Sequence, residues 1–600
     1  MKRSTYIWSL LVGCVAFATS CDLTENVQVK ADKSMIFGSK SGLELYSNSF
    51  YKALPTLKNG FMQDKMCDVG AVSNTDTFIK QGAYNTETAT SWSWGALKNI
   101  NYFIDGCNDP KYCTVDDNTR DNYLGIARWF RAWFYYDKLT TYGEVPWFPH
   151  DIQSYQNDVM YKDRDSRDVI IRNLIADLDF AYEHIQATSS TGSATLTRWA
   201  AAALKSRVCL FEAAYRRYHN LTGLEITPEE LYREAAKAAK LVIDNSGCSL
   251  NTAAGKKGAY RDLFYSETPL TQEVILAVCA NEKSGIFGEQ NWWFNARSYG
   301  LCWSLVRSFV HTYLKQDGTP FTAAADYAVK SFAEEMEGRD LRLEQTVRGR
   351  NFLWDGKTAV ADIKNLSLTG YQVIKYTLDE SKYDGGAKNI NSIPLIRYAE
   401  VLLNYAEAQA ELGVITDSEW ALTVGALRKR AGITGGTETL PTTVDSYLQR
   451  TFYPDVTSPV LLEIRRERAI ELVAEGMRFD DLRRWKCGSL METLPWSGIH
   501  IPGLEQPVDV NGDGVNDYYF TEGEVASAPA AYKNIAVRVN QDGVGLYAEA
   551  NPVSGYDLVY KTGAGDRYWY PDGRQYLYPI PAKVIRDYRN AGYTLSLIHI

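Results

Sequence analysis

Residues 119–149 read TRDNYLGIARWFRAWFYYDKLTTYGEVPWFP, and the chain is organised around this stretch. Its apolar residues recur at intervals of four, three and four along one side of a helix: Tyr123, Ala127, Phe130 and Phe134. A second apolar stripe lies beside the first: Ile126, Trp129, Trp133 and Tyr136. Gly143 can adopt the left-handed conformation that ends a helix, and Pro146 cannot continue one. The stretch predicts a helix of an α-rich domain, covered on more than one side.

The composition is that of a folded protein with many aromatic residues. Of 600 residues, 45% are apolar and 23% are charged, and there is no low-complexity run. The aromatic content is high, with 40 Tyr, 15 Trp and 21 Phe, and the flat rings of Trp and Tyr can stack on sugar rings. A net charge of -9 without clustered Lys and Arg argues against a nucleic-acid partner.

Apolar periodicity predicts helices beyond the first one, in the segments 43–57, 94–104, 166–185, 197–218, 228–243, 394–412 and 461–485. Small residues at 200–203 let neighbouring helices approach closely, and Pro228 after Thr227 is a favoured helix start. Three of these helices start about 31 to 32 residues apart, close to the period of about 34 in tetratricopeptide repeats. The spacing indicates stacked helical repeats.

The order of residues in the first helix is more specific than its periodicity. The Arg-Ala-Trp-Phe-Tyr-Tyr run at 131–136, followed by Leu139 and by Tyr-Gly-Glu-Val-Pro at 142–146, resembles the hallmark of the RagB/SusD family. The resemblance extends from Cys21 to about Arg589. Three further blocks resemble the same family: 94–104, 394–412 and 461–485.

Members of the RagB/SusD family are nutrient-binding lipoproteins of the outer membrane of Bacteroidetes. The resemblance implies a mainly α fold, with a tetratricopeptide-like helical scaffold, large irregular loop-rich insertions and few short strands. It also implies a non-catalytic protein that captures glycan and delivers it to a partner TonB-dependent outer membrane transporter. A peptide-importing branch of the family keeps peptide open as an alternative cargo.

The predicted organisation is a signal peptide at 1–20, a lipid-anchored tether at 21–40 and a single α-rich domain at 41–595. Residues 596–600 depart from the closing pattern of the family, and no function is assigned to them. The large domain is divided into loop-rich binding insertions at 58–93 and 246–393, helical repeats at 94–245 and 394–487, and a C-terminal loop region at 488–595.

The N-terminus has the pattern of a lipoprotein signal. A basic start is followed by an apolar run of about 14 residues, which ends in Ala-Thr-Ser before Cys21. This run is too short to span a membrane, which takes about 20 apolar residues. Small residues before Cys21 resemble a bacterial lipobox, although an ordinary cleavage that leaves Cys21 free is the alternative. Asp22 and Glu25 resemble a surface-export signal, so we expect a surface-exposed outer membrane protein held only by its lipid.

Two cysteines are close enough in sequence to pair. The spacing of Cys107 and Cys113 suits a small disulfide loop in an oxidising compartment. No pair has the Cys-x-x-Cys spacing of a zinc or redox site. We expect the other cysteines of the mature chain to be buried free thiols.

The strongest metal signal is the acidic loop at 509–517. Oxygen side chains alternate along it and Gly514 permits a sharp bend, which suits a structural calcium ion. The twelfth position of the loop is Phe520 instead of the closing glutamate, so a metal-free turn is the alternative. The expected calcium positions are Asp509, Asn511, Asp513, Val515 and Asp517.

Catalytic signatures are absent from the sequence. It contains no His-Glu-x-x-His array, no Gly-x-Ser-x-Gly elbow, no phosphate loop and no dinucleotide fingerprint. A glycoside hydrolase is a weaker alternative, since 73 acidic residues could supply its two carboxylates. The helix at 461–485 is dense in Glu and Arg, a composition typical of a solvated or ion-paired surface. Its neighbours at helical spacing are Glu463 with Arg466 and Arg468 with Glu471.

Aromatic residues of the loop-rich segments are the candidate ligand contacts, because they bring a large contact area at low entropy cost. The run at 292–294 does not fit the stripe of a half-buried helix, so some of its rings are expected on the surface. A core position is the alternative for every candidate, and Trp94 could simply cap its helix. The candidates are Trp92, Trp94, Trp292, Trp293, Tyr299 and Trp303.

Overall fold

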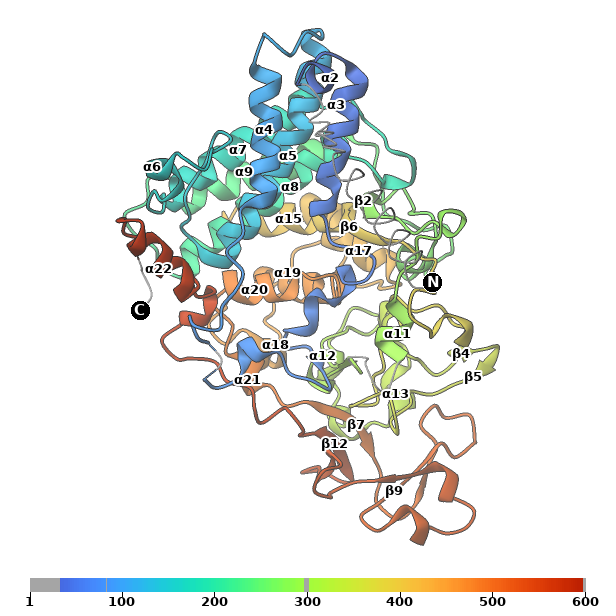
Figure 1. Cartoon of the computed structure of the whole chain (residues 1–600). Helices are drawn as coiled ribbons and strands as arrows, with labels where there is room; N and C mark the ends of the chain where they lie inside the picture. Colours follow the sequence, from blue (N-terminus) through green and yellow to red (C-terminus); the bar gives the residue numbers. More distant parts are fainter. Residues whose placement is uncertain (1–32, 83, 296–301, 597–600) are drawn as a thin grey trace, which may run out of the picture.

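The computed structural model describes residues 33–82, 84–295 and 302–596. It is mainly helical, and successive helices pack on one another: α4 on α5, α5 on α7, α7 on α8 and α8 on α9 (Figure 1). Helix α15 then links α9 to α19. This arrangement confirms the predicted helical scaffold. The long helices and their partners are α4 (Gly95–Asn108), α5 (Asp117–Tyr142), α7 (Arg167–His184), α8 (Arg198–Tyr218), α9 (Pro228–Asn245), α15 (Tyr398–Glu411), α19 (Pro459–Glu471) and α20 (Arg478–Arg484).

The ends of these helices follow capping residues in the sequence. The Asp116 side chain accepts a hydrogen bond from the backbone N–H of Thr119 at the start of α5. Thr227 and Glu230 form a reciprocal capping box at the start of α9. Gly143 ends α5 with a φ of 75°, which other residues adopt only at a cost. The predicted end of the first helix and the predicted start after Thr227 are confirmed.

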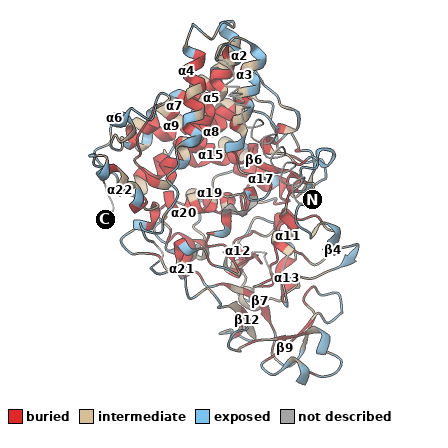
Figure 2. Cartoon of the chain, in the orientation of Figure 1, coloured by how far each residue is buried: buried red, intermediate tan, exposed pale blue. Residues whose placement is uncertain are grey.

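Helix α5 is packed on more than one side, as its two apolar stripes predict. Trp129 and Phe130 are fully buried, and the Trp129 indole N–H donates to the Ala200 carbonyl of α8 at 3.1 Å. Along the second stripe, Trp133 stacks on Trp129 with ring centroids 5.4 Å apart. Buried residues concentrate on α5, α8, α15 and α19 (Figure 2). The quoted stretch therefore supplies a central helix of the scaffold.

Three predicted helices have different bounds in the structure. The segment 43–57 forms α3 (Lys40–Ser47) followed by the 3-10 helix η1 (Asn48–Ala53). The segment 394–412 begins as strand β6 (Ile393–Arg397), which pairs antiparallel with β2 (Val274–Val278), and α15 starts only after it. The pairing with a strand more than a hundred residues earlier decides this boundary, and a local apolar pattern cannot report it.

The third difference is a break within the segment 461–485. Helix α19 ends at Glu471 and α20 begins at Arg478. Between them, Ala474 and Gly476 have φ values of 65° and 83°, which a helix does not allow. The side chain of Asp64 accepts hydrogen bonds from the backbone N–H groups of Gly476 and Arg478 at 3.0 and 3.2 Å. Because Asp64 replaces partners that a continuous helix would supply, it stabilises the break.

The Glu and Arg side chains of α19 are ion-paired and buried, so they are not solvated. Glu471 is fully buried and pairs with Arg342, Arg397 and Arg430. The predicted pair of Glu463 with Arg466 is present at 3.4 Å. The predicted pair of Arg468 with Glu471 is wrong, since the Arg468 guanidinium binds Asp481 of α20 at 2.8 Å. These charges join α19 to surrounding segments of the chain.

The strands are short and form small separate sheets. A three-stranded antiparallel sheet has the order β11-β12-β7, and a second sheet with the order β10-β9-β8 lies at the lower end of Figure 1. The two-stranded sheets are β2 with β6, β1 with β3, and β4 with β5. The bounds not yet given are β1 (Gly70–Ala71), β3 (Ser304–Leu305), β4 (Leu353–Trp354), β5 (Lys357–Thr358), β7 (Ser497–Ile501), β8 (Pro507–Val508), β9 (Tyr518–Thr521), β10 (Ala536–Arg538), β11 (Leu546–Ala550) and β12 (Tyr556–Tyr560).

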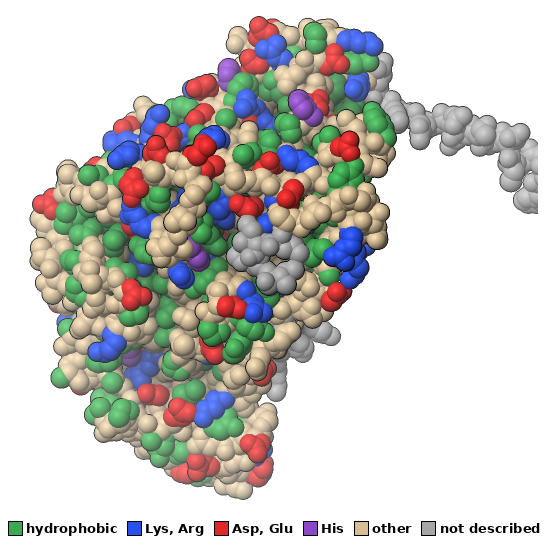
Figure 3. Space-filling view, turned by 90° about the vertical axis from the view of Figure 1, so that its left-hand side faces the viewer, with side chains coloured by type: hydrophobic (Ala, Val, Ile, Leu, Met, Phe, Trp, Pro, Cys, Tyr) green, Lys and Arg blue, Asp and Glu red, His purple; other side chains and the backbone are tan. Residues whose placement is uncertain are grey.

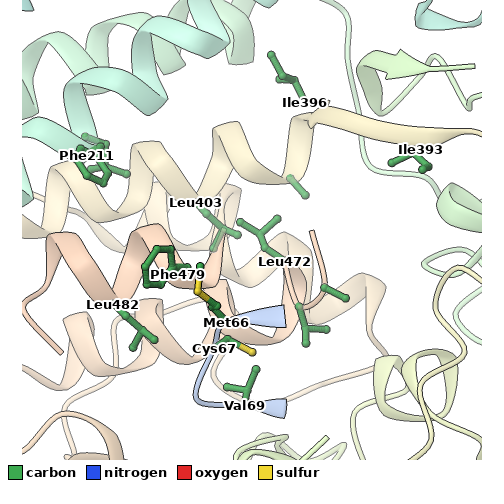
Figure 4. Close-up of a cluster of buried hydrophobic side chains, with 14 of the residues drawn as sticks. Met66, Cys67, Val69, Phe211, Ile393, Ile396, Leu403, Leu472, Phe479 and Leu482 are labelled. Carbon is green, nitrogen blue, oxygen red and sulfur yellow. The ribbon is translucent and has the colours of Figure 1, made fainter. Parts of the chain in front are cut away.

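One hydrophobic core joins distant parts of the chain. Figure 4 shows Met66 and Cys67, which precede β1, in one cluster with Leu403 of α15 and with Phe479 and Leu482 of α20. All five side chains are buried. Early and late segments of the chain are therefore held in a common core.

The cysteines of the described residues are free thiols, so the predicted disulfide between Cys107 and Cys113 is wrong. Cys107 is on the buried side of α4 with 2% of its surface exposed, whereas Cys113 is half-buried in the loop that follows. Over the same described ranges, no helix combines the length and the apolar character needed to cross a membrane.

Candidate functional site

An open cavity of about 660 Å³ lies between the start of α4, the loop at 148–154 and the C-terminal helix α22 (Ala582–Asn590). The side of the molecule that carries α22 faces the viewer in Figure 3, where charged side chains of both signs are intermixed. We call this space the tryptophan cavity. Five aromatic side chains line it: Trp92, Trp94, Phe148, Tyr161 and Tyr588.

The two predicted tryptophans of this cavity are packed against each other. The rings of Trp92 and Trp94 meet edge to face with centroids 5.4 Å apart. Trp94 also packs against Phe148 at 5.2 Å, and Trp92 against Tyr142 at 4.9 Å. Trp94 stands at the N-cap position of α4, but its side chain makes no capping hydrogen bond. Both tryptophans are half-buried, so part of each ring is fixed by packing while part is exposed.

Polar side chains of α4 fix the loop that forms the opposite wall. Asn101 donates hydrogen bonds to the Phe148 and His150 carbonyls at 2.8 and 3.1 Å. Lys98 donates to the Ile152 carbonyl at 3.0 Å and pairs with Asp151 at 3.6 Å. Because four residues of the loop are bound to one helix, the wall is preorganised, which lowers the entropy cost of ligand binding.

The third wall comes from the last described helix of the chain. Tyr588 of α22 packs edge to face on Tyr161 at 5.2 Å, and its hydroxyl donates to the Lys162 carbonyl at 3.2 Å. Lys583 and Asp587 pair with each other along α22 at 2.6 Å. Phe148, Tyr161 and Tyr588 are not among the ligand contacts predicted from the sequence. Their aromatic character is visible in the sequence, but the contact between segments more than 400 residues apart is not.

Trp292 and Trp293 lie in a different part of the molecule. They belong to the short helix α11 (Gln290–Asn295), which is on the opposite side from α22 in Figure 1. This run therefore lies in a short helix, although its three consecutive aromatic residues do not fit the stripe of a half-buried helix. The backbone N–H of Asn291 donates to the Asn389 side chain at 2.8 Å and fixes the short helix from outside. Both indoles are half-buried, with centroids 5.1 Å apart.

The structure describes one of the remaining two candidates, Trp303. Trp303 is 4% exposed, and a Cβ atom on Gly70 would come within 2.4 Å of its Nε1. The indole fills the space that this glycine leaves, so Trp303 is a core residue rather than an open platform. Tyr299 lies outside the described residues.

A sequence model of the SusD family matches residues 272–593 of the chain. The chain belongs to the SusD family. It is similar over 93% of its length to a solved SusD-like carbohydrate-binding protein from Bacteroides fragilis, with 19% identity, 99% of that chain covered and a TM-score of 0.66. A second SusD-like protein from the same organism is 21% identical, with 93% and 97% of the two chains covered and a TM-score of 0.62.

A SusD superfamily protein from Parabacteroides distasonis has 18% identity and a TM-score of 0.53, with 92% of this chain and 98% of that chain covered. At these identities the solved structures show that the fold is shared. No curated protein matches the chain. SusD family members are outer membrane lipoproteins that bind their ligands without catalysis.

The tryptophan cavity of this SusD family member has the chemistry of a binding site. The carboxylate among its described lining residues is Asp587, which is paired with Lys583. A glycosidase needs two carboxylates on either side of the scissile bond. The lining thus offers rings, amides and single charges for recognition, in agreement with the non-catalytic character of the family.

The acidic loop at 509–517 is held by its own hydrogen bonds. Asp509 accepts the backbone N–H groups of Gly512 and Gly514, each at 2.7 Å, and Asp517 accepts that of Val510 at 2.8 Å. Burial raises the pKa of Asp517, and the neighbouring carboxylates of the loop add to the rise. Within the described ranges, no group of three or more His, Cys, Asp or Glu side chains is arranged to hold a metal ion. Calcium binding by this loop stays a prediction.

Proposed function

We propose that this SusD family protein is a surface lipoprotein that captures an oligosaccharide or polysaccharide and delivers it to a partner TonB-dependent outer membrane transporter. The tryptophan cavity is the proposed capture site. Its lipid would be carried by Cys21, which lies outside the described residues, and the lipid would be the only attachment of the chain to the membrane.

The observation that carries this proposal is the pairing of Trp92 and Trp94 at the edge of an open cavity. The volume of about 660 Å³ falls within the range of about 300–1,000 Å³ that is common for small-ligand sites. Indole faces can cover the apolar C–H surface of a sugar, while neighbouring polar groups can bind its hydroxyls. Lys98 and Lys583 are exposed donors at this cavity.

Titration calorimetry against a panel of soluble glycans and peptides tests the proposal. We expect a neutral glycan to bind, and we expect Trp92→Ala and Trp94→Ala each to weaken binding by about tenfold or more, as for other aromatic anchors. Tyr265→Ala is the matched control, because Tyr265 is exposed but does not line the cavity. Binding of peptides alone would favour the peptide-importing alternative, and undiminished glycan binding by both variants would exclude this site.

The indoles of Trp292 and Trp293 are proposed as a second glycan contact, separate from the cavity. A double Trp292→Ala, Trp293→Ala variant should weaken binding of a long polysaccharide more than binding of a short fragment, because only a long chain can reach both sites. Equal affinity of the variant and the wild type for every glycan would remove these residues from the site. The partner is tested by co-purification of a TonB-dependent barrel with this protein from native membranes.

A further inference from the structure

A second open cavity, of about 460 Å³, adjoins the tryptophan cavity. His150 lines both cavities. The second cavity extends along α4 toward α5 and α7, and three arginines line it: Arg120, Arg128 and Arg131. We call it the arginine cavity. His150 therefore stands at the boundary of both cavities.

One face of α4 runs under both cavities. Leu97, Lys98 and Asn101 line the tryptophan cavity, and Asp105 and Asn108 line the arginine cavity. From Lys98 to Asn108 these residues follow one another at intervals of three and four, so they lie along one stripe of the helix, with Leu97 beside it. With a rise of about 1.5 Å per residue, the stripe is about 16 Å long. The two cavities therefore share a continuous floor.

At the junction between the cavities, hydrogen bonds hold the backbone of His150, whereas its side chain is exposed. Asp105 binds Nδ1 of His150 at 2.8 Å and also accepts the backbone N–H of Asp151 at 2.8 Å. Asn101 holds the His150 carbonyl at 3.1 Å. The His150 side chain is nevertheless 76% exposed. An extended ligand that crosses this point would meet an immobilised imidazole.

The arginine cavity has the chemistry of a polyhydroxyl site with little net charge. Arg128 lies over the Phe180 ring at 4.2 Å, and Arg128 and Arg131 both bind the buried Asp177. Arg120 is paired with Asp117 and Asp121 at 2.8 and 2.9 Å. Since each of these guanidiniums already has a carboxylate partner, they keep N–H donors for hydroxyls but offer little attraction to an anionic group.

We infer that the two cavities form one extended site for a linear, uncharged glycan. Sugar residues at one end pack on Trp92 and Trp94, the chain crosses His150, and further residues bind the donors and acceptors of the arginine cavity. This inference deepens the proposed function and rests on it. The inferred cargo is an uncharged glycan that is too long for the tryptophan cavity alone.

A size ladder tests the inference. The neutral polysaccharide that binds most tightly in the glycan panel is partially hydrolysed, and fragments from disaccharide to octasaccharide are titrated into the full chain. Affinity should rise with length until both cavities are filled. A double Asn108→Ala, Arg120→Gln variant should lower affinity for the longest fragments by about tenfold. It should leave the affinity for the shortest binding fragment unchanged.

Arg172→Gln is the matched control, because Arg172 is an exposed, paired arginine that lines neither cavity. Melting temperatures of all variants check that they fold. An affinity that stops rising at a fragment short enough for the tryptophan cavity would overturn the inference. So would equal losses at all lengths, or tighter binding of acidic oligosaccharides of matched length.

These experiments distinguish a failure of the extended site from a failure of the proposed function. If Trp92→Ala weakens binding of short fragments while the arginine-cavity variant changes nothing, the proposed function stands and the extended site is wrong. If no glycan binds the wild type, both fall.

Discussion

At the scale of single residues, the dominant feature is a buried network of charges. Glu471 is fully buried and accepts hydrogen bonds from Arg342 and Arg397 at 2.8 and 3.0 Å and from Arg430. Burial by itself raises the pKa of the Glu471 carboxyl, but the three arginines outweigh it and hold the pKa well below its usual range. Such a group stabilises the fold only while its partners are present.

Glu471→Gln should therefore destabilise the protein by about 3 to 5 kcal/mol, because three buried guanidiniums lose their common counter-charge. Urea unfolding monitored by circular dichroism measures the loss. Glu229→Gln is the control, since Glu229 pairs with Arg217 at a half-exposed position and should change stability by less than about 1 kcal/mol. A similar small effect for both variants would contradict the prediction.

His219 gives the protein a specific pH dependence. Burial lowers the pKa of its imidazole to about 4, although its hydrogen bond to the Arg483 carbonyl opposes the shift. The folded pKa is thus below the usual value of 6.5. The unfolded chain binds a proton at His219 before the folded chain does, so the stabilising contribution is present above pH 6.5 and is lost as the pH falls toward 4.

The test is the free energy of unfolding between pH 4 and 7 for the wild type and for His219→Gln. The wild type should lose stability relative to the variant as the pH falls, by an amount on the order of 3 kcal/mol at full effect. Parallel curves for the two proteins would show that His219 titrates normally in the folded state.

At the scale of elements, local patterns identify helices well but not where they are interrupted. The periodicity of 461–485 continues across the break between α19 and α20, and only Asp64, about 410 residues earlier, shows why the chain turns there. The early start predicted for α15 fails for the same reason, since the partner strand β2 lies far away in sequence. Gly143 and Thr227 act within one turn, which is why their effects could be predicted.

Calcium binding by the loop at 509–517 is the testable prediction at this scale. If it binds calcium, adding Ca²⁺ to the chelator-treated protein should raise the melting temperature, because a ligand that binds only the folded state stabilises it. Asp509→Asn should abolish this rise, and Mg²⁺ at the same concentration should not reproduce it. An unchanged melting temperature with and without chelator would show that the loop is held by its hydrogen bonds alone.

At the scale of the whole molecule, the predicted lipid determines where the protein works. Cys21→Ala should move the protein from the membrane fraction to the soluble fraction, because no helix of the described residues could cross a membrane in place of the lipid. Fractionation with labelled fatty acid checks both the attachment and its site. Cys67→Ala is a control, as this buried thiol should have no effect on fractionation. Retention of Cys21→Ala in the membrane would contradict the prediction.

The candidate site was only partly predictable from sequence. Trp92 and Trp94 could be identified because they stand in a loop beside a recognisable helix, and the structure brings them to one cavity. The separation of Trp292 and Trp293 from them, and the burial of Trp303 against Gly70, depend on how distant segments pack. Residue type indicates what a ring can do, whereas its exposure is a property of its neighbours.

The sequence by itself determined the family, the helical scaffold and most helix ends, because periodicity and capping act over a few residues. Tertiary structure decided the break in the third helical block, the buried pairing of its charges and the joining of α4 with α22 around one cavity. These features depend on contacts between segments hundreds of residues apart. Packing and charge compensation select such contacts only once the whole chain has folded.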